Sequence, residues 1–216
     1  MADRPIIFSA PMVQALLAGR KSQTRRVLKP QPNDRNTGGA ALTDQGWAWL
    51  NGWDGSIIGR ASVPYAPGDR LYVREAACWV SGWGWRYRAD NDDLTEKREA
   101  GEGGRWRPSI HMPRWASRLT LTVTDVRVQR LQDISEADAI AEGIQRLIGS
   151  KGPNYFTREI SGKWSGSFNA PTAAEVYSDL WNSLHGPDAW DANPWVVALT
   201  FTVQCGNIDQ IGGANG

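Results

Sequence analysis

Histidine, cysteine and long apolar runs are scarce in this sequence of 216 residues. The two cysteines, Cys78 and Cys205, have a spacing that fits neither a disulfide framework nor a zinc motif. No run of eighteen apolar residues occurs, and Asp3 stands where a secretory signal would be basic and then apolar. We therefore expect a cytoplasmic protein without a membrane span, a structural metal or another cofactor.

The motifs that hold nucleotides or catalytic metals are also missing. The sequence contains no GxxxxGK[ST], no GxGxxG after a strand, and no HExxH, GxSxG or CxxC. Only His111 and His185 are available for histidine-based proton transfer. His111 lies among basic and aromatic residues in RPSIHMPRW and is a candidate ligand contact. His185 precedes Gly186 and is expected to cap the C-terminus of a helix.

The net charge of +1 conceals two strongly basic segments. Residues 1–30 carry six basic and one acidic side chain, as do residues 105–130, whereas residues 131–216 carry four basic and ten acidic side chains. Arginine accounts for 19 of the 24 basic residues, and its planar guanidinium binds phosphate through two donors and stacks on bases. This pattern favours an anionic partner such as nucleic acid or a nucleotide, with a solvated basic surface as the alternative.

Tryptophan is abundant, with 12 residues that lie mostly in loops rich in glycine or arginine. Aromatic side chains hold unstacked nucleobases by stacking, at roughly 1–3 kcal/mol per base. The alternative is that these side chains anchor long loops to the core. The candidates for base contacts are the four that have arginine neighbours, namely Trp83, Trp85, Trp106 and Trp115.

Apolar spacing and capping residues predict one domain over residues 1–204, with a disordered tail at 205–216. Helices are expected over 9–19, 135–143 and 172–185, each with a Ser or Thr N-cap and a C-terminal glycine. The buried stripe of the second helix is expected to be Ala137, Ile140, Ala141 and Ile144.

Alternating apolar residues predict strands over 71–74, 117–131 and 194–203. A phase change near Thr124 and Asp125 indicates a bulge or turn within the second of these. The ranges 31–62, 81–108 and 148–170 have the composition of long, partly Trp-rich loop insertions, the first with at most a hairpin. Short strands, two or three helices and no βαβ alternation predict an α+β fold, a small mixed β-barrel decorated by helices. An open antiparallel sheet is the alternative.

The segment GRKSQTRR, residues 19–26, places Thr24 among one lysine and three arginines. A lysine serves as base for a threonine hydroxyl only when its amine is neutral, and burial beside like charges favours that form. The alternative is that Lys21 stays charged and holds a phosphate. In a straight strand Lys21 and Thr24 would face opposite sides, so the pair can act together only if the chain turns or bulges after Gly19.

Three segments, LLAGRKSQTRR, PGDRLYVRE and ISEADAIAEGI, together resemble the ASCH domain, a PUA-like β-barrel family related to RNA-binding PUA domains. The longer strings PIIFSAPMVQALLAGRKSQTRRV and SIHMPRWASRLTLTV resemble the versions encoded by phages and prophages, which would act in the host cytoplasm. The resemblance covers about residues 5–30, 64–76, 109–146 and 190–203 and leaves out the Trp-rich insertions.

One bacterial branch of this family removes the acyl group from N4-acetylcytidine with a lysine, a threonine three residues later and a glutamate on a helix. The resemblance implies that Thr24 is the nucleophile, Lys21 its base and Glu142 a proton shuttle. It also implies a nucleoside or nucleic-acid partner, either RNA or modified DNA. Further expected contacts are Arg20, Arg25, Arg26, Arg74, Glu75, His111 and Arg114. Because other ASCH proteins bind or cleave RNA, a non-catalytic RNA- or modified-base-binding module and a ribonuclease remain alternatives.

Overall fold

The computed structural model describes residues 2–32, 37–90, 104–146, 154–160, 163–165 and 170–211. Strands predominate in this α+β chain, and the described residues form four short α-helices. These are α1 (Ala10–Leu17), α3 (Glu136–Ala141), α4 (Ala173–His185) and α5 (Ile208–Ile211). Single 3-10 turns are η1 (Arg88–Asp90), η2 (Ser109–His111), η3 (Arg114–Ala116) and η4 (Leu131–Asp133). None of the described helices has the length and apolar character needed to span a bilayer.

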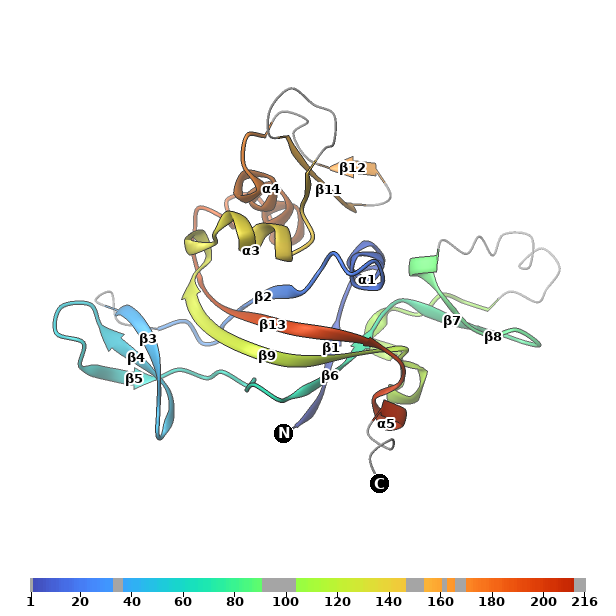
Figure 1. Cartoon of the computed structure of the whole chain (residues 1–216), viewed down its shortest axis with the longest axis horizontal. Helices are drawn as coiled ribbons and strands as arrows, with labels where there is room; N and C mark the ends of the chain where they lie inside the picture. The colour runs from blue at the N-terminus through green and yellow to red at the C-terminus, as the bar shows by residue number, and fades with distance from the viewer. Residues whose placement is uncertain are drawn as a thin grey trace.

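The central element is a five-stranded sheet in which a long, curved pair of strands lies in the middle (Figure 1). Its strands, in spatial order, are β1 (Asp3–Ile7), β6 (Arg70–Arg74), β9 (Leu119–Arg130), β13 (Trp195–Cys205) and β2 (Gln23–Val27). The β1 and β6 pair is parallel and the other pairs are antiparallel. The α+β class is thereby confirmed. Within the described residues no strand pairing joins β1 to β2, so the expected closed barrel is not confirmed.

The phase change in β9 is a β-bulge, as predicted. Asp125 lies opposite Thr200 and Val123 lies opposite Phe201, so Thr124 is the extra residue. The bulge lets Leu121 and Val123 on one side of it, and Val126 on the other, all enter the same core although their sequence parity differs. β9 therefore continues as one strand although the alternation of its apolar residues changes phase at Thr124.

Three small sheets that the sequence pattern did not indicate lie in or next to the predicted insertions. Strands β3 (Thr37–Thr43), β4 (Gly46–Asn51) and β5 (Ile57–Arg60) form the first, where at most a hairpin was expected. The second is the hairpin β7 (Ala77–Val80) and β8 (Gly84–Tyr87), and the third is β10 (Gln145–Arg146), β11 (Tyr155–Ile160) and β12 (Lys163–Ser165). Glycine-rich strands such as TGGAALT lack the apolar alternation that predicts a strand, because neither face is fully buried.

The expected disordered tail is wrong for its first seven residues. β13 extends to Cys205, and α5 follows at Ile208–Ile211 with the side chain of Ile208 buried. Asn207 donates hydrogen bonds to the carbonyls of Arg114 and Ser117, at 2.9 and 2.8 Å. These contacts hold the segment against the body of the protein. Residues 212–216 lie outside the described residues.

Two hydrophobic clusters lie on opposite faces of β13. Val197, Leu199 and Phe201 join the main cluster with Val13 and Leu16 of α1. Val196 joins a second cluster, in which α4 provides the most members and α3 provides Ala139. Because successive residues of a strand point to opposite faces, β13 is covered on both sides over its first half. This arrangement places α1, α3 and α4 around β2, the edge strand next to β13 (Figure 1).

The predicted stripe of the second helix is only partly correct: Ile144 is buried as expected, just after α3 ends, but Ala137 and Ile140 are exposed and Ala141 is half-buried. Ala139 is the buried residue within α3, whereas Ile140 is 44 % exposed. The inward face instead carries Asp138, Ala139 and, at the C-cap, Glu142. Carboxylates can occupy this face because two buried cations, Lys21 before β2 and Arg25 within it, pair with them there, and hydrophobic periodicity does not register such pairs.

Candidate active site

Lys21 is positioned by the way α1 ends. Gly19 closes the helix with φ +67°, and the backbone N–H groups of Arg20 and Lys21 donate to the carbonyl of Ala15, at 2.9 and 3.2 Å. Strand β2 begins only at Gln23, so Lys21 lies in the connecting turn rather than in the strand. The chain therefore turns after Gly19, as the sequence required for Lys21 and Thr24 to share one site.

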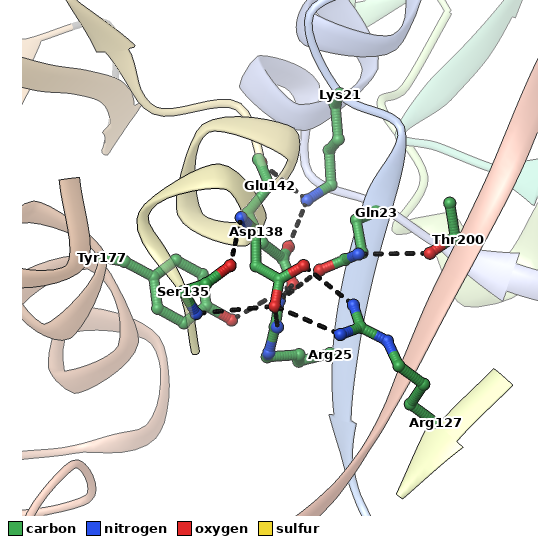
Figure 2. Close-up of polar contacts among 9 residues, drawn as sticks. All are labelled: Lys21, Gln23, Arg25, Arg127, Ser135, Asp138, Glu142, Tyr177 and Thr200. Carbon is green, nitrogen blue, oxygen red and sulfur yellow. Dashed lines mark hydrogen bonds and ion pairs between the residues drawn. The ribbon is translucent and has the colours of Figure 1, made fainter. Parts of the chain in front are cut away.

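Lys21 and Glu142 form a buried ion pair. Lys21 is 2 % exposed, and its Nζ donates to Oε2 of Glu142 at 2.7 Å and to the backbone carbonyl of Glu142 at 2.8 Å (Figure 2). Glu142, the C-cap of α3, is 3 % exposed. The same contact thus ties the end of α3 to the start of β2.

A second ion pair extends this network. Arg25 donates to Oε1 of Glu142 at 3.1 Å and to Oδ2 of Asp138 at 2.9 Å. Arg127 of β9 donates to Oδ1 of Asp138 at 2.8 Å. Although burial opposes ionisation, hydrogen bonds from Arg127 and Gln23 and the charges of Arg25 and Arg127 lower the pKa of Asp138 to about 2. Asp138 is therefore ionised at neutral pH and holds both arginines in place.

A small pocket opens beside this network, along the edge of β2. Its volume is about 30 Å³, enough for a water molecule but not for a nucleobase. The lining comes from α1, β2, α3 and α4, namely Met12, Lys21, Thr24, Arg25, Arg26, Glu142, Tyr177, Leu180, Trp181, Leu184 and His185. The three residues expected to be catalytic thus face one cavity, although Lys21 and Glu142 are 121 positions apart.

Thr24 and Lys21 are not hydrogen-bonded to each other in the described structure. Thr24 is 4 % exposed, and its hydroxyl has no hydrogen-bond partner among the described residues. The donors of Lys21 point to Glu142 instead. The hydroxyl is therefore uncommitted while the amine is engaged, and catalytic hydrogen bonds are often completed only when substrate binds.

The three arginines of the GRKSQTRR segment have different environments. Arg25 is 4 % exposed, and its Nη1 and Nη2 groups donate to Gln23, Glu142 and Asp138, whereas its buried Nε has no hydrogen-bond partner among the described residues. Its guanidinium therefore faces carboxylates rather than an open surface. Arg26 donates to the carbonyl of Ile7 at 2.7 Å and lies over the ring of Phe8. Arg20 is half-buried and does not line the pocket.

Arg74 and Glu75 lie outside the pocket lining. Arg74 donates to the carbonyls of Met112, at 2.8 Å, and Ile110. Glu75 is 1 % exposed and accepts two hydrogen bonds from Arg118, at 2.8 and 3.1 Å. Burial raises the pKa of Glu75, and the partly opposing hydrogen bonds and charge of Arg118 do not cancel this effect. Arg74 thus links β6 to η2 and the residue after it, and Glu75 links the end of β6 to Arg118, just before β9.

The other expected ligands are also absent from the pocket lining. Arg114 forms ion pairs with Asp3 and Asp209, both at 2.6 Å, and so links β1 to α5. His111 lies in a separate surface groove with Trp106. Trp83, Trp85 and Trp115 gather at the β7–β8 hairpin and the adjoining η3.

Sequence reasoning missed two polar pocket residues on α4. Tyr177 donates from its hydroxyl to Oε1 of Glu142 at 3.4 Å (Figure 2). His185 lines the pocket, its Nδ1 lies 3.1 Å from the carbonyl of Trp181, and its ring stacks on that of Trp181. Tyr177 does lie on the apolar face of the helix over residues 173–185. Helical spacing places it in the core, but the same spacing would be seen whether or not its hydroxyl reaches a polar partner. His185 was expected only as a helix cap.

Neither family models nor the curated proteins nor the solved structures gave a match to this chain. Among the residues that the structure describes, no three His, Cys, Asp or Glu side chains are grouped so as to hold a metal ion. The chemistry of this site is therefore inferred from its lysine, hydroxyl and carboxylate.

Proposed function

We propose that this protein is an amidohydrolase that removes an N4-acyl group from a cytosine nucleoside, with Thr24 as nucleophile, Lys21 as base and Glu142 as proton shuttle. The observation that carries this proposal is that the three side chains line one pocket. In this proposal the curved sheet is an open form of the PUA-like barrel of the ASCH family, whose motifs these residues match.

The first half of the reaction transfers the acyl group to Thr24. The carboxylate of Glu142, 2.7 Å from Nζ, takes a proton from Lys21, and the neutral amine accepts the proton of the Thr24 hydroxyl. Oγ1 of Thr24 then bonds to the acyl carbon. The bond from this carbon to N4 breaks, and Lys21 returns the proton to N4, which leaves as the amine of cytidine.

The second half regenerates the enzyme. Water attacks the threonine ester while the neutral Lys21 accepts one of its protons, and the acid is released when Oγ1 recovers that proton from Lys21. Glu142 then returns its proton to Lys21, which restores the starting ion pair. Arg25 and Tyr177 hydrogen-bond to Oε1 of Glu142, so that Oε2 faces Lys21. This division of the two carboxylate oxygens keeps the shuttle oriented towards the amine.

The substrate must enlarge the pocket in order to enter. A cavity of about 30 Å³ is far below the few hundred Å³ typical of small-molecule sites. Met12 and Leu184 line it, and Leu184 is 45 % exposed at the end of α4. We assign these two flexible side chains as the ones that move to admit the acylated base.

The test is hydrolysis of N4-acetylcytidine by the full-length protein, with cytidine followed by chromatography. Thr24→Val removes the hydroxyl at almost constant volume and should reduce the rate at least about 100-fold, whereas Thr24→Ser should retain activity. Thermal unfolding of the three proteins verifies that they fold alike. Absence of product with the wild type, or an unchanged rate with Thr24→Val, would refute the proposal.

A non-catalytic binding protein is the second candidate. It is favoured by the observation that both hydrogen bonds of Lys21 go to Glu142 and none to Thr24. For such a protein, N4-acetylcytidine or an oligonucleotide would bind without turnover, and Thr24→Val would leave that affinity nearly unchanged.

A further inference from the structure

The β7–β8 hairpin projects from the main sheet at the end of the molecule opposite to β3–β5 (Figure 1). Exposed tryptophans gather at this hairpin and at η3: Trp79 is 56 % exposed, Trp83 55 % and Trp115 64 %. Large aromatic side chains that cluster on a surface are uncommon in the absence of a partner. This cluster therefore indicates a ligand that covers the exposed aromatic rings.

The rings are held in a fixed arrangement. Trp85 is half-buried and makes edge contacts with Trp79, with centroids 5.9 Å apart at 73°, and with Trp115, at 5.4 Å and 69°. Trp85 therefore contacts both of these exposed rings. Rings that are fixed before a ligand arrives lose little conformational freedom when they stack on it.

Cations surround these rings. The guanidinium of Arg86 lies 5.2 Å from the ring centre of Trp83, and that of Arg88 lies 5.7 Å from that of Trp106. Arg105 and Arg107 are exposed beside Trp106 in the groove that also contains His111. Within the described part of the chain, neither of these two arginines forms an ion pair. The surface thus combines stacking rings with positive charge.

We propose that this hairpin face, made of Trp79, Trp83, Trp85, Trp106, Trp115, Arg105 and Arg107, binds single-stranded nucleic acid. Unpaired bases offer flat faces to the tryptophans, and the phosphates between them match the arginines. A duplex hides its base faces inside the stack, so it would use only the charges. An uncharged protein surface would cover the rings but leave the arginines without partners.

The hairpin face and the candidate active site lie on two flanks of the same helix. Nε2 of Gln14 in α1 donates to the carbonyl of Ala89 in η1, directly after β8, at 2.7 Å. Met12, two residues earlier in α1, lines the pocket. This step rests on the proposed function. If the pocket hydrolyses an N4-acyl group, the substrate class is a polynucleotide, and the hairpin face holds the strand that carries the acylated cytosine.

The binding test uses fluorescence anisotropy with a labelled ten-nucleotide single strand, as RNA and as DNA, and with the matching duplex. We expect Trp79→Ala with Trp115→Ala to weaken single-strand binding at least about tenfold. Trp53→Ala is the matched control, because Trp53 is 88 % exposed in the turn between β4 and β5, and it should change nothing. Stacking tolerates either sugar, so RNA and DNA should bind within a few-fold of each other.

A salt titration tests the arginines. Replacing both Arg105 and Arg107 by alanine should reduce the slope of log affinity against log salt by about 1.4, the value for two phosphate contacts on a single strand.

Several outcomes would overturn the proposal: no binding by the wild type, tighter binding of the duplex, or unchanged affinity in the double tryptophan variant. Self-association that the tryptophan substitutions abolish, without oligonucleotide binding, would identify a protein contact instead. The two proposals fail separately. Thr24→Val should keep full oligonucleotide affinity, and the hairpin variants should keep hydrolysis of free N4-acetylcytidine while losing preference for an acetylated oligonucleotide.

Discussion

Nζ of Lys21 and Oε2 of Glu142 lie 2.7 Å apart, and both side chains are almost completely shielded from water. The pair joins the turn before β2 to the end of α3, and both residues line the candidate pocket. Its chemistry and its contribution to stability are therefore coupled, and they have to be separated by experiment.

The first prediction concerns the stability of this pair. Lys21→Met leaves the carboxylate of Glu142 buried with Arg25 as its remaining ion-pair partner, and Glu142→Gln leaves the amine without its counter-charge. Each single change should lower the free energy of unfolding by about 3–5 kcal/mol. The double variant should lose less than the sum, because neither charge is then left alone. Urea unfolding of the four proteins measures this, and strictly additive losses would show that the pair contributes nothing.

The second prediction concerns Asp138, whose pKa is lowered from 3.8 to about 2 in the folded protein. A lowered carboxyl pKa adds stability that is complete above the unfolded value and is lost as the pH falls towards the folded value. We expect a loss on the order of 2 kcal/mol between about pH 5 and pH 2 from this group. Asp138→Asn should be less stable than the wild type at pH 7, with a smaller difference at pH 2. Unfolding curves at several pH values check this, and equal differences at all pH values would contradict it.

The third prediction concerns the bulge in β9. Deleting Thr124 removes the extra residue, so one half of β9 must shift by one position relative to β13. Either the Leu121 and Val123 side or the Val126 side then turns away from the core. The deletion should abolish cooperative thermal unfolding or lower stability by several kcal/mol. Thr124→Ala keeps the chain length and should cost less than about 1 kcal/mol. Similar stability of the deletion and the substitution would show that the register adapts freely.

The fourth prediction concerns Gly19, which ends α1 with φ +67°. A Cβ at this position would meet no atom within 4 Å, so alanine costs only the backbone strain of the left-handed region. Gly19→Ala should therefore lower stability by about 1–2 kcal/mol. Because the turn positions Lys21, hydrolysis should fall by a larger factor than stability alone explains. Unfolding and hydrolysis are measured on the same preparation, and unchanged hydrolysis would show that the strain does not reach Lys21.

Local patterns in the sequence predicted the features that depend on near neighbours. Ser135 and Thr172 cap α3 and α4 through the backbone N–H groups of Asp138 and Glu175, as expected. The alternation of Leu71 and Val73 with Tyr72 and Arg74 predicted β6, and the phase change predicted the bulge. Each of these signals is contained in a few consecutive residues, where steric and hydrogen-bonding preferences act directly.

The candidate site was predictable only in part. The resemblance selected Lys21, Thr24 and Glu142, and the turn at Gly19 followed from helix-ending rules. Tyr177 and the small size of the pocket did not follow, because they depend on how α4 packs against β2 and α3. The inward face of α3 was predicted wrongly for the same reason, since its carboxylates become acceptable in the interior only where buried cations meet them.

The sequence by itself determined where most helices begin and end, how β9 changes phase and which residues are able to do acid, base or nucleophile chemistry. Tertiary structure alone decided that the sheet stays open between β1 and β2, that the insertions form small sheets, and that an amine, a hydroxyl and a carboxylate share one cavity. The division has a physical cause: capping and strand alternation are satisfied within a few residues, whereas buried charges and cavities depend on partners from distant parts of the chain.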